Sequence, residues 1–167
     1  MESDALPMRA DSNLRTLEAF YSAFSARDGE GMSACYHDNA RFQDPVFDLH
    51  GAEVGAMWRM LCSRGKDLRV ETSNLKTDND SGSTDWQAWY SFSTTGRSVH
   101  NVVHSQFRFA DGRIVEQIDT FSFASWSRQA LGSIGLLLGW TPMLKRKVRA
   151  NARTALASFM ANENPTR

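Results

Sequence analysis

The sequence predicts an α+β domain in which helices pack on one face of a curved antiparallel sheet. Apolar residues recur at helical spacing through residues 12–64, whereas residues 68–124 form four strand-like segments separated by short turns. Short turns join antiparallel neighbours, and helices followed by a run of strands are typical of α+β domains. A chain of 167 residues that is 41% hydrophobic can bury the core of one such domain.

The first helix is expected to begin at Asp11 or Ser12, because either side chain can cap it, and to end near Asp28-Gly29. Residues 1–11 would then form a flexible tail. The helix buries one apolar face, which consists of Leu14, Leu17, Phe20, Tyr21 and Phe24.

Two further helices and one short strand complete the first half. The second helix is broken at residues 37–39, and its apolar positions are Met32, Cys35 and Tyr36. Residues 40–43 form the strand, after which Asp44-Pro45 opens a turn, because proline disfavours the helical conformation in the residue before it. The third helix ends at residues 64–65, and its apolar face consists of Val54, Met57, Trp58, Leu61 and Cys62.

The four strand segments span residues 68–77, 84–94, 98–109 and 113–124. Asp111-Gly112 joins the last two and is the strongest hairpin signal in the sequence. On the last strand, Asp119 lies in an otherwise apolar row with Val115, Phe121 and Phe123, while the opposite face carries Ile114 and Ile118. A carboxylate in an apolar row must be hydrogen-bonded, paired, protonated or functional, because desolvating an unpartnered charge is costly. Asp119 is therefore the first candidate for a functional site.

Residues beyond 125 return to a helical pattern. A helix over residues 126–131 is followed by an apolar link that contains glycines, and Pro142 opens a last helix. Its apolar face consists of Leu144, Val148, Ala152, Ala155, Leu156 and Phe159. Its other faces carry Lys145, Arg146, Lys147, Arg149 and Arg153, with no acidic residue before Glu163. We interpret this as a solvated cationic face, and contact with an acidic surface or a membrane interface remains the alternative.

Charge and composition exclude several classes of partner. The 19 basic residues balance the 19 acidic ones, so the net charge favours neither nucleic acid nor an anionic membrane as a partner. Cys35 and Cys62 both fall on apolar helix faces, which favours reduced thiols. The N-terminus has no signal-peptide pattern and no apolar run is long enough to span a bilayer, so we expect a cytoplasmic protein without stable membrane insertion.

Several short motifs occur in an informative order. They are FYSAF at residues 20–24, YHDNARFQDP at residues 36–45, Gly51, Trp58, TGR at residues 95–97 and FRFADGRIVEQID at residues 107–119. Together they resemble the nuclear transport factor 2-like superfamily over about residues 12–124, in particular its SnoaL-like and ketosteroid isomerase-related branch. The resemblance implies a cone-shaped fold, in which a bent antiparallel sheet wraps around the N-terminal helices and leaves a pocket. Residues 125–167 would be a helical extension packed on the same domain.

The superfamily hosts many activities, so its functional residues transfer only position by position. The general base of ketosteroid isomerase corresponds to Asp44, but its oxyanion-hole tyrosine and acid correspond to Phe20 and Ser105. Phenylalanine cannot donate a hydrogen bond, so the isomerase chemistry is not expected. The epoxide hydrolase pattern is not found at matching positions. The acid-base aspartate of SnoaL corresponds to Asp119.

Asp119 and Asp44 are the predicted catalytic pair, because two carboxylates facing one pocket have their pKa values pushed apart and can supply an acid and a base. The alternatives are an Asp119 that is satisfied by an Arg or a Trp indole N–H, and an Asp44 that only caps its turn. His104 is a third catalytic candidate or a dimer-interface residue. His100 is about 13 Å away along the strand, too far to share a metal ion, and no metal or cofactor is expected. The expected pocket walls are Phe20, Phe24, Trp58, Tyr90, Ser105, Phe107 and Phe121.

These candidates suggest a cofactor-independent enzyme that acts by proton transfer on a small apolar or polycyclic molecule, as an isomerase, cyclase, dehydratase or hydrolase. The alternative is a non-catalytic module that binds a small ligand or serves only to dimerise. Apolar residues on both faces of residues 84–124 favour a homodimer through the outer face of the sheet.

Overall fold

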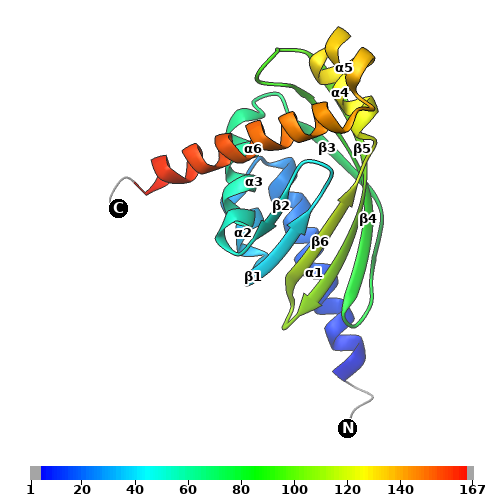
Figure 1. Cartoon of the computed structure of the whole chain (residues 1–167). Helices are drawn as coiled ribbons and strands as arrows, with labels where there is room; N and C mark the ends of the chain where they lie inside the picture. The colour runs from blue at the N-terminus through cyan, green and yellow to red at the C-terminus, as the bar shows by residue number, and fades with distance from the viewer. Residues whose placement is uncertain (1–4, 165–167) are drawn as a thin grey trace.

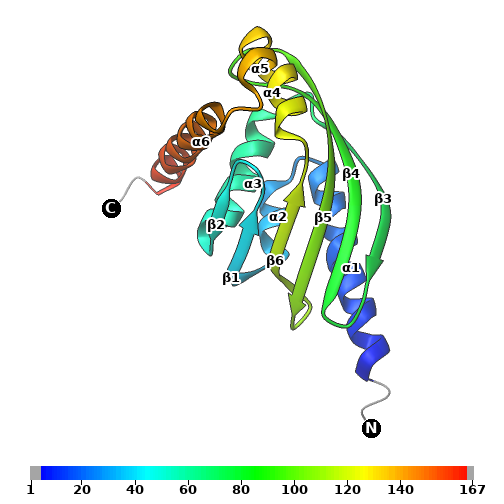
Figure 2. The same cartoon turned by 45° about the vertical axis from the view of Figure 1, so that its right-hand side comes forward.

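The computed structural model describes residues 5–164, and its six strands form one bent sheet in the order β2-β1-β6-β5-β4-β3. Helices α1, α2 and α3 lie on the concave side of the sheet, and α6 extends away from its open end (Figures 1 and 2). The predicted α+β architecture is therefore confirmed. The elements are α1 (Ala5–Ser25), α2 (Gly29–Ala34), β1 (Tyr36–Gln43), β2 (Asp48–His50), α3 (Ala52–Arg64), β3 (Arg69–Thr77), β4 (Ser81–Ser91), β5 (Ser98–Ala110), β6 (Arg113–Thr120), α4 (Phe123–Leu131), α5 (Ser133–Leu138) and α6 (Pro142–Glu163).

The first helix begins earlier than its sequence pattern indicated. Residues 5–11, which were expected to belong to a flexible tail, are helical, and residues 1–4 lie outside the described residues. Pro7 falls in the first turn, where the missing N–H has no intrahelical partner to lose. Proline at this position therefore does not prevent the helix from starting upstream of Asp11.

Strand β1 is longer than predicted, because a distant strand pairs with its first residues. Tyr36, expected on the second helix, is aligned with Ile114 of β6 in the parallel β1–β6 pair. Residues 37–39, expected to break a helix, belong to the same strand. After the turn at Asp44, the chain returns as β2, a three-residue strand that was not predicted and that pairs antiparallel with β1.

Strand β6 is shorter than predicted and contains a register shift. A bulge between its pairings with Arg108 and Phe109 puts Ile114 on the same buried face as Gln117 and Asp119, so the simple alternation expected for Ile114 was wrong. The strand ends at Thr120, where Ser122 caps α4 by accepting a hydrogen bond from the Ser125 N–H. Residues 123–124 are therefore helical, and α5 replaces the predicted apolar link.

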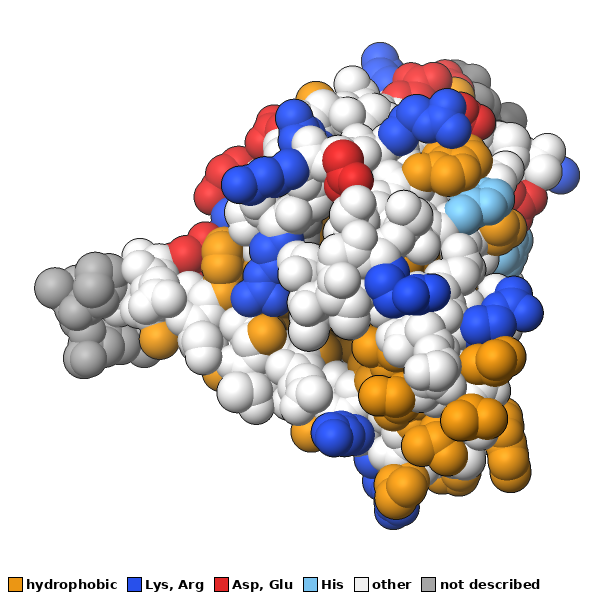
Figure 3. Space-filling view, turned by 90° about the horizontal axis from the view of Figure 1, so that it is seen from above, with side chains coloured by type: hydrophobic (Ala, Val, Ile, Leu, Met, Phe, Trp, Pro, Cys, Tyr) orange, Lys and Arg blue, Asp and Glu red, His pale blue; other side chains and the backbone are white. Residues whose placement is uncertain are grey.

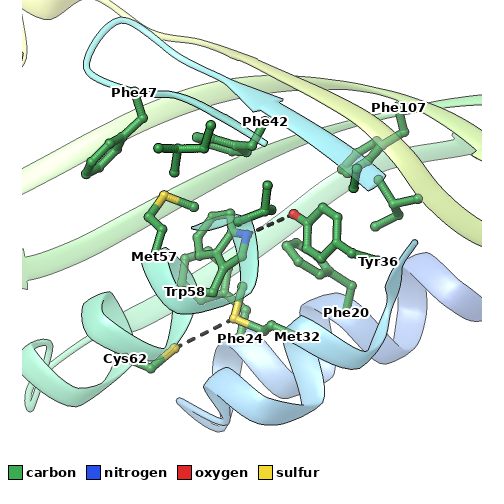
Figure 4. Close-up of a cluster of buried hydrophobic side chains, with 14 of the residues drawn as sticks. Phe20, Phe24, Met32, Tyr36, Phe42, Phe47, Met57, Trp58, Cys62 and Phe107 are labelled. Carbon is green, nitrogen blue, oxygen red and sulfur yellow. Dashed lines mark hydrogen bonds between the residues drawn. The ribbon is translucent and has the colours of Figure 1, made fainter. Parts of the chain in front are cut away.

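The core is organised around Phe20, which is fully buried in the C-terminal part of α1. Its ring makes edge-on or tilted contacts with five other rings, at centroid distances of 5.1 to 6.4 Å (Figure 4). These rings belong to Tyr21, Phe24, Tyr36, Trp58 and Phe107. One side chain thus connects α1 to β1, α3 and β5.

Helix α6 packs against α3 and buries Leu144 and Leu156, two residues of its predicted apolar face. Glu163 at its end forms two hydrogen bonds of 2.7 and 2.9 Å with the Arg59 guanidinium. Within residues 5–164, no helix combines the length and the apolar character needed to cross a membrane.

Phe20→Ala is expected to lower the free energy of unfolding by ~3–5 kcal/mol, because it leaves a cavity among five rings that cannot all move inward. Urea unfolding followed by circular dichroism measures the loss. Met8→Ala is the matched control on the same helix, since Met8 is 70% exposed, and its effect should stay within about 0.5 kcal/mol. Equal losses in both variants would contradict the central role of Phe20.

Candidate active site

A cavity of about 280 Å³ opens between the concave face of the sheet, α3 and α6. Six of the predicted site residues line it: Phe24, Asp44, Trp58, Tyr90, Asp119 and Phe121. Much of the remaining wall is apolar and includes Phe42, Phe47, Met57, Trp86, Trp126, Val148, Ala152 and Ala155. The structure therefore brings both predicted carboxylates to one largely apolar cavity.

Asp119 is only 5% exposed, and its two carboxylate oxygens have different surroundings. Its Oδ1 accepts hydrogen bonds from Ser105 Oγ at 2.5 Å and from Gln117 Nε2 at 2.9 Å. Its Oδ2 has no hydrogen-bond partner among the described residues. One oxygen thus holds the carboxyl group in place, and the other is available to a molecule in the cavity.

Two chains of hydrogen bonds end at Asp119 Oδ1, and each of them begins at an indole N–H group. Trp86 Nε1 donates to Ser105 Oγ at 2.7 Å, and Trp58 Nε1 donates to the Tyr36 hydroxyl at 2.8 Å (Figure 4). Tyr36 in turn donates to Gln117 Oε1, which turns the amide N–H₂ of Gln117 toward Asp119. Because an indole can only donate, each chain runs from a tryptophan to Asp119 Oδ1.

Burial raises the pKa of Asp119 to about 7, because the aromatic surroundings disfavour its charged form. The hydrogen bonds from Ser105 and Gln117 lower the pKa, and the charge of Asp44 raises it further. No cation forms an ion pair with Asp119 in the described part of the chain. The carboxyl group can therefore gain or lose a proton near neutral pH.

Asp44 lies in the turn between β1 and β2 and combines two roles that the sequence left open. Its Oδ1 accepts the backbone N–H groups of Val46 and Phe47, both at 2.6 Å, so it does cap its turn. It also lines the cavity. Burial raises its pKa to about 6, while the two turn hydrogen bonds and the cations Arg149 and Lys145 oppose this shift. Burial thus raises the pKa of both carboxyl groups, so each can exchange a proton near neutral pH.

Tyr90 supplies a neutral hydroxyl group to the same cavity. Trp126 Nε1 of α4 donates a hydrogen bond of 2.9 Å to the Tyr90 oxygen, and the Tyr90 proton has no acceptor among the described residues. Burial raises the pKa of Tyr90 to about 12, so the phenol keeps its proton at neutral pH. Tyr90 can therefore donate a hydrogen bond to an oxygen atom of a bound molecule.

Four predicted site residues lie away from the cavity walls. Phe20 and Phe107 belong to the core beneath the cavity, and Ser105 acts through its hydrogen bond to Asp119. His104 lies on the outer face of β5, where its Nδ1 is 2.6 Å from Asp85 Oδ1 and its side chain is 49% exposed. This position does not support the catalytic assignment of His104, because neighbouring residues of a strand point to opposite faces.

Sequence reasoning missed Gln117, Trp86, Trp126 and the role of Tyr36. Gln117 lies two residues before Asp119 and therefore on the same face of the strand, which was a usable signal. Trp86 and Trp126 had no such signal in the sequence. A tryptophan whose indole donates a functional hydrogen bond occurs at the same apolar positions as a tryptophan that only fills the core. Within residues 5–164, no group of three or more His, Cys, Asp or Glu side chains could hold a metal ion.

Comparison with known families decides the classification. The family model for the SnoaL-like domain matches residues 17–117, which include the second part of α1, the Asp111-Gly112 hairpin turn and most of the sheet. The chain belongs to the SnoaL-like domain family. No curated protein matches this SnoaL-like chain.

Solved structures confirm the nuclear transport factor 2-like fold of the SnoaL-like domain. An epoxide hydrolase of M. tuberculosis described as LEH-like is 19% identical with a TM-score of 0.59, covering 77% of this chain and 96% of that one. A protein from Burkholderia pseudomallei described as NTF2-like is 23% identical (TM-score 0.62; 71% and 97% covered). TerC, co-crystallised with polyporic acid, is 14% identical (TM-score 0.62; 72% and 99% covered). At these identities the likeness shows the fold alone.

Asp119→Asn is expected to raise the melting temperature above about pH 7 and to change it little near pH 4. The folded chain holds the Asp119 proton up to a pKa of about 7, whereas the ordinary value is 3.8, so ionisation removes stability from the wild type as the pH rises between these values. The amide has no such ionisation, and its Oδ1 can accept both hydrogen bonds. Circular dichroism melts across this pH range measure the difference.

Asp85→Asn is the control with the opposite sign. Hydrogen bonds from His104 and Asn74 hold the pKa of Asp85 below its usual range, so this variant should be less stable than the wild type at neutral pH and equal to it in acid. A large loss of stability in Asp119→Asn at neutral pH that disappears in acid would mean that the charge of Asp119 has a structural role. Asp44 would then be the only carboxylate left as a catalytic candidate.

Proposed function

We propose that this SnoaL-like protein is a cofactor-independent enzyme that moves a proton on a small, largely apolar molecule. The observation that carries the proposal is the asymmetry of Asp119: Oδ1 is held by two donors, and Oδ2 is left for the cavity. Together with a pKa of about 7, this is the arrangement that general acid-base catalysis requires near neutral pH.

The three polar groups of the cavity divide the chemistry among them. We assign Asp44 as the base, because the cations Arg149 and Lys145 favour its charged form. Asp119 has no cation in an ion pair among the described residues and is the acid, and the Tyr90 hydroxyl stabilises negative charge that develops on an oxygen. Removal of a proton beside a carbonyl group, with its return elsewhere, fits this set. This kind of proton transfer occurs in isomerases, cyclases and dehydratases.

The substrate class follows from the walls of the cavity. Aromatic rings and aliphatic side chains dominate them, and about 280 Å³ is at the small end for ligand pockets. A small apolar or polycyclic molecule with one or two oxygen atoms matches these walls, and the TerC complex with polyporic acid shows that a similar fold binds an organic acid. A cytoplasmic location is part of this proposal.

The second candidate is a module that binds the same kind of molecule without changing it. It is favoured by Asp44, whose Oδ1 is already used twice within its own turn and which therefore has a structural reason to be present. The two candidates predict the same ligands and differ only in turnover.

Asp119→Asn is expected to reduce turnover by a factor of about 10² to 10⁴ while ligand binding is kept, because the amide cannot exchange a proton with the substrate. A thermal-shift screen of small apolar carbonyl compounds with the wild type identifies ligands. Each ligand is then incubated in deuterated water, and deuterium uptake or rearrangement is followed by NMR. Ligands that bind the wild type but remain unchanged would favour the binding module.

Tyr90→Phe is expected to lower kcat by roughly 10² while the affinity for the ligand changes little, since the lost hydrogen bond forms mainly to the developing charge. Ser127→Ala is the control, because the Ser127 hydroxyl is also buried but donates to the Ala124 carbonyl and does not line the cavity. Comparable loss in both variants would point to a general packing defect instead of a catalytic hydroxyl group.

The homodimer also stays a prediction. On the outer face of β5 the residues are exposed and mostly polar. The larger apolar groups of the outer face of the sheet include Val102, Ile118 and Trp89, which stacks on His100. Val102→Asp is expected to turn a dimer into a monomer, because it buries a charge in the contact. Sedimentation velocity at micromolar concentration measures this, and a wild type that sediments at 18.8 kDa would contradict the dimer.

A further inference from the structure

The end of the molecule that carries α4 and α5 has a hydrophobic surface, which we name the α5 tip (Figures 1 and 2). It consists of Ile134, Leu136, Leu137, Trp140 and Met143, which are 57, 63, 68, 79 and 63% exposed. Five such side chains within ten residues exceed the scattered apolar groups of an ordinary surface. Figure 3 shows hydrophobic side chains gathered at one corner of this end of the molecule.

Two glycines explain why these side chains face outward. Gly135 and Gly139 are buried, and added Cβ atoms would lie 1.8 Å from the Ser127 carbonyl oxygen and 2.3 Å from the Ser127 hydroxyl. Helix α5 therefore packs closely on α4 through its glycines, and its large apolar side chains are left on the solvent side. A helix that only contributes to the core would show the reverse pattern.

Unpaired cations accompany the tip. Residues 120–162 contain no acidic side chain, and Arg128, Lys145, Arg146 and Lys147 form no ion pair within the described residues. Met143, Arg146 and Lys147 share one face of α6, so the apolar surface continues directly into a cationic one. In Figure 3, blue cationic side chains lie beside the hydrophobic corner, and the red acidic ones lie farther away.

We propose that the α5 tip binds the surface of a lipid bilayer that contains anionic lipids. Leucine and isoleucine side chains insert at the acyl boundary, Trp140 lies at the level of the headgroups, and the cations of α6 meet the lipid phosphates. This is peripheral binding by a short surface helix and needs no membrane-spanning segment.

Charge repulsion argues against a second copy of the chain as the partner of the α5 tip. A symmetric contact between two tips would bring the same four cations of each copy together, with no acidic side chain nearby in the sequence to compensate them. An anionic bilayer supplies the missing negative charge and the apolar phase at once.

The tip also lies near the cavity. Trp126 of α4 and Val148 of α6 line the cavity, and α5 connects these two helices. If the proposed function is right, an apolar substrate dissolved in the bilayer reaches the cavity over a short path. Binding of the tip to the bilayer does not depend on that function.

The test is flotation of the full chain with vesicles of phosphatidylcholine, with and without phosphatidylglycerol. The wild type should bind the anionic vesicles and lose most of this binding at high salt. Leu136→Ser/Leu137→Ser and Arg146→Gln/Lys147→Gln should each bind roughly tenfold more weakly or worse. Both pairs are exposed or solvent-facing, so melting temperatures should match the wild type.

Matched controls sit elsewhere on the surface. Arg108→Gln/Arg113→Gln removes two exposed cations from the hairpin at the far end of the sheet, and Val102→Ser removes an exposed apolar group from the outer face. Neither should change vesicle binding. Wild-type chain that does not float with anionic vesicles, or that floats equally well with the tip substituted, overturns the proposal. A dimer that Leu136→Ser/Leu137→Ser converts to a monomer also overturns it, in favour of a contact between two copies.

Discussion

Desolvation of the Asp119 carboxyl group is the constraint on which the arrangement of the site depends. A carboxylate at 5% exposure among aromatic rings is costly unless its charge is stabilised by hydrogen bonds or removed by a proton. This chain does both in part: two donors hold Oδ1, and the pKa rises to about 7. Neutral donors in place of a cation keep the group close to the point at which it exchanges its proton.

The same donors connect the site to the core. Trp58 of α3 and Trp86 of β4 must each lie within hydrogen-bond distance of a hydroxyl on another element, and Phe24 packs between the two indoles, at 5.2 and 5.3 Å. Phe20 contacts both Tyr36 and Trp58. Phe20 thus packs the aromatic groups that orient Asp119.

Local patterns in the sequence predicted the features that depend on local chemistry. The Asp-Gly turn, the helix opened by Pro142, and the placement of Asp44 and Asp119 at one cavity follow from turn residues, spacing and the SnoaL-like motifs. The predictions that the structure corrects concern features that depend on residues far away in the sequence. Tyr36 belongs to a strand because Ile114 pairs with it. Ile114 faces the core because of a β-bulge, and no sequence pattern in β6 indicates that bulge. Histidine is a residue type that is common in active sites, but the alternation of side chains along β5 places His104 on the outer face.

Helix α6 lies outside residues 17–117, which match the family, yet it contributes to the site in two opposing ways. Val148, Ala152 and Ala155 form part of the cavity wall, and burial is the main cause that raises the pKa of Asp44. Arg149 and Lys145 of the same helix lower that pKa, and Arg149 also donates to the Pro45 carbonyl at 2.9 Å and so holds the turn that carries Asp44. A wall without these cations would raise the pKa of Asp44 further. The extension therefore encloses the carboxyl pair, while its cations favour the charged form of Asp44, which is the form in which a carboxyl group serves as a base.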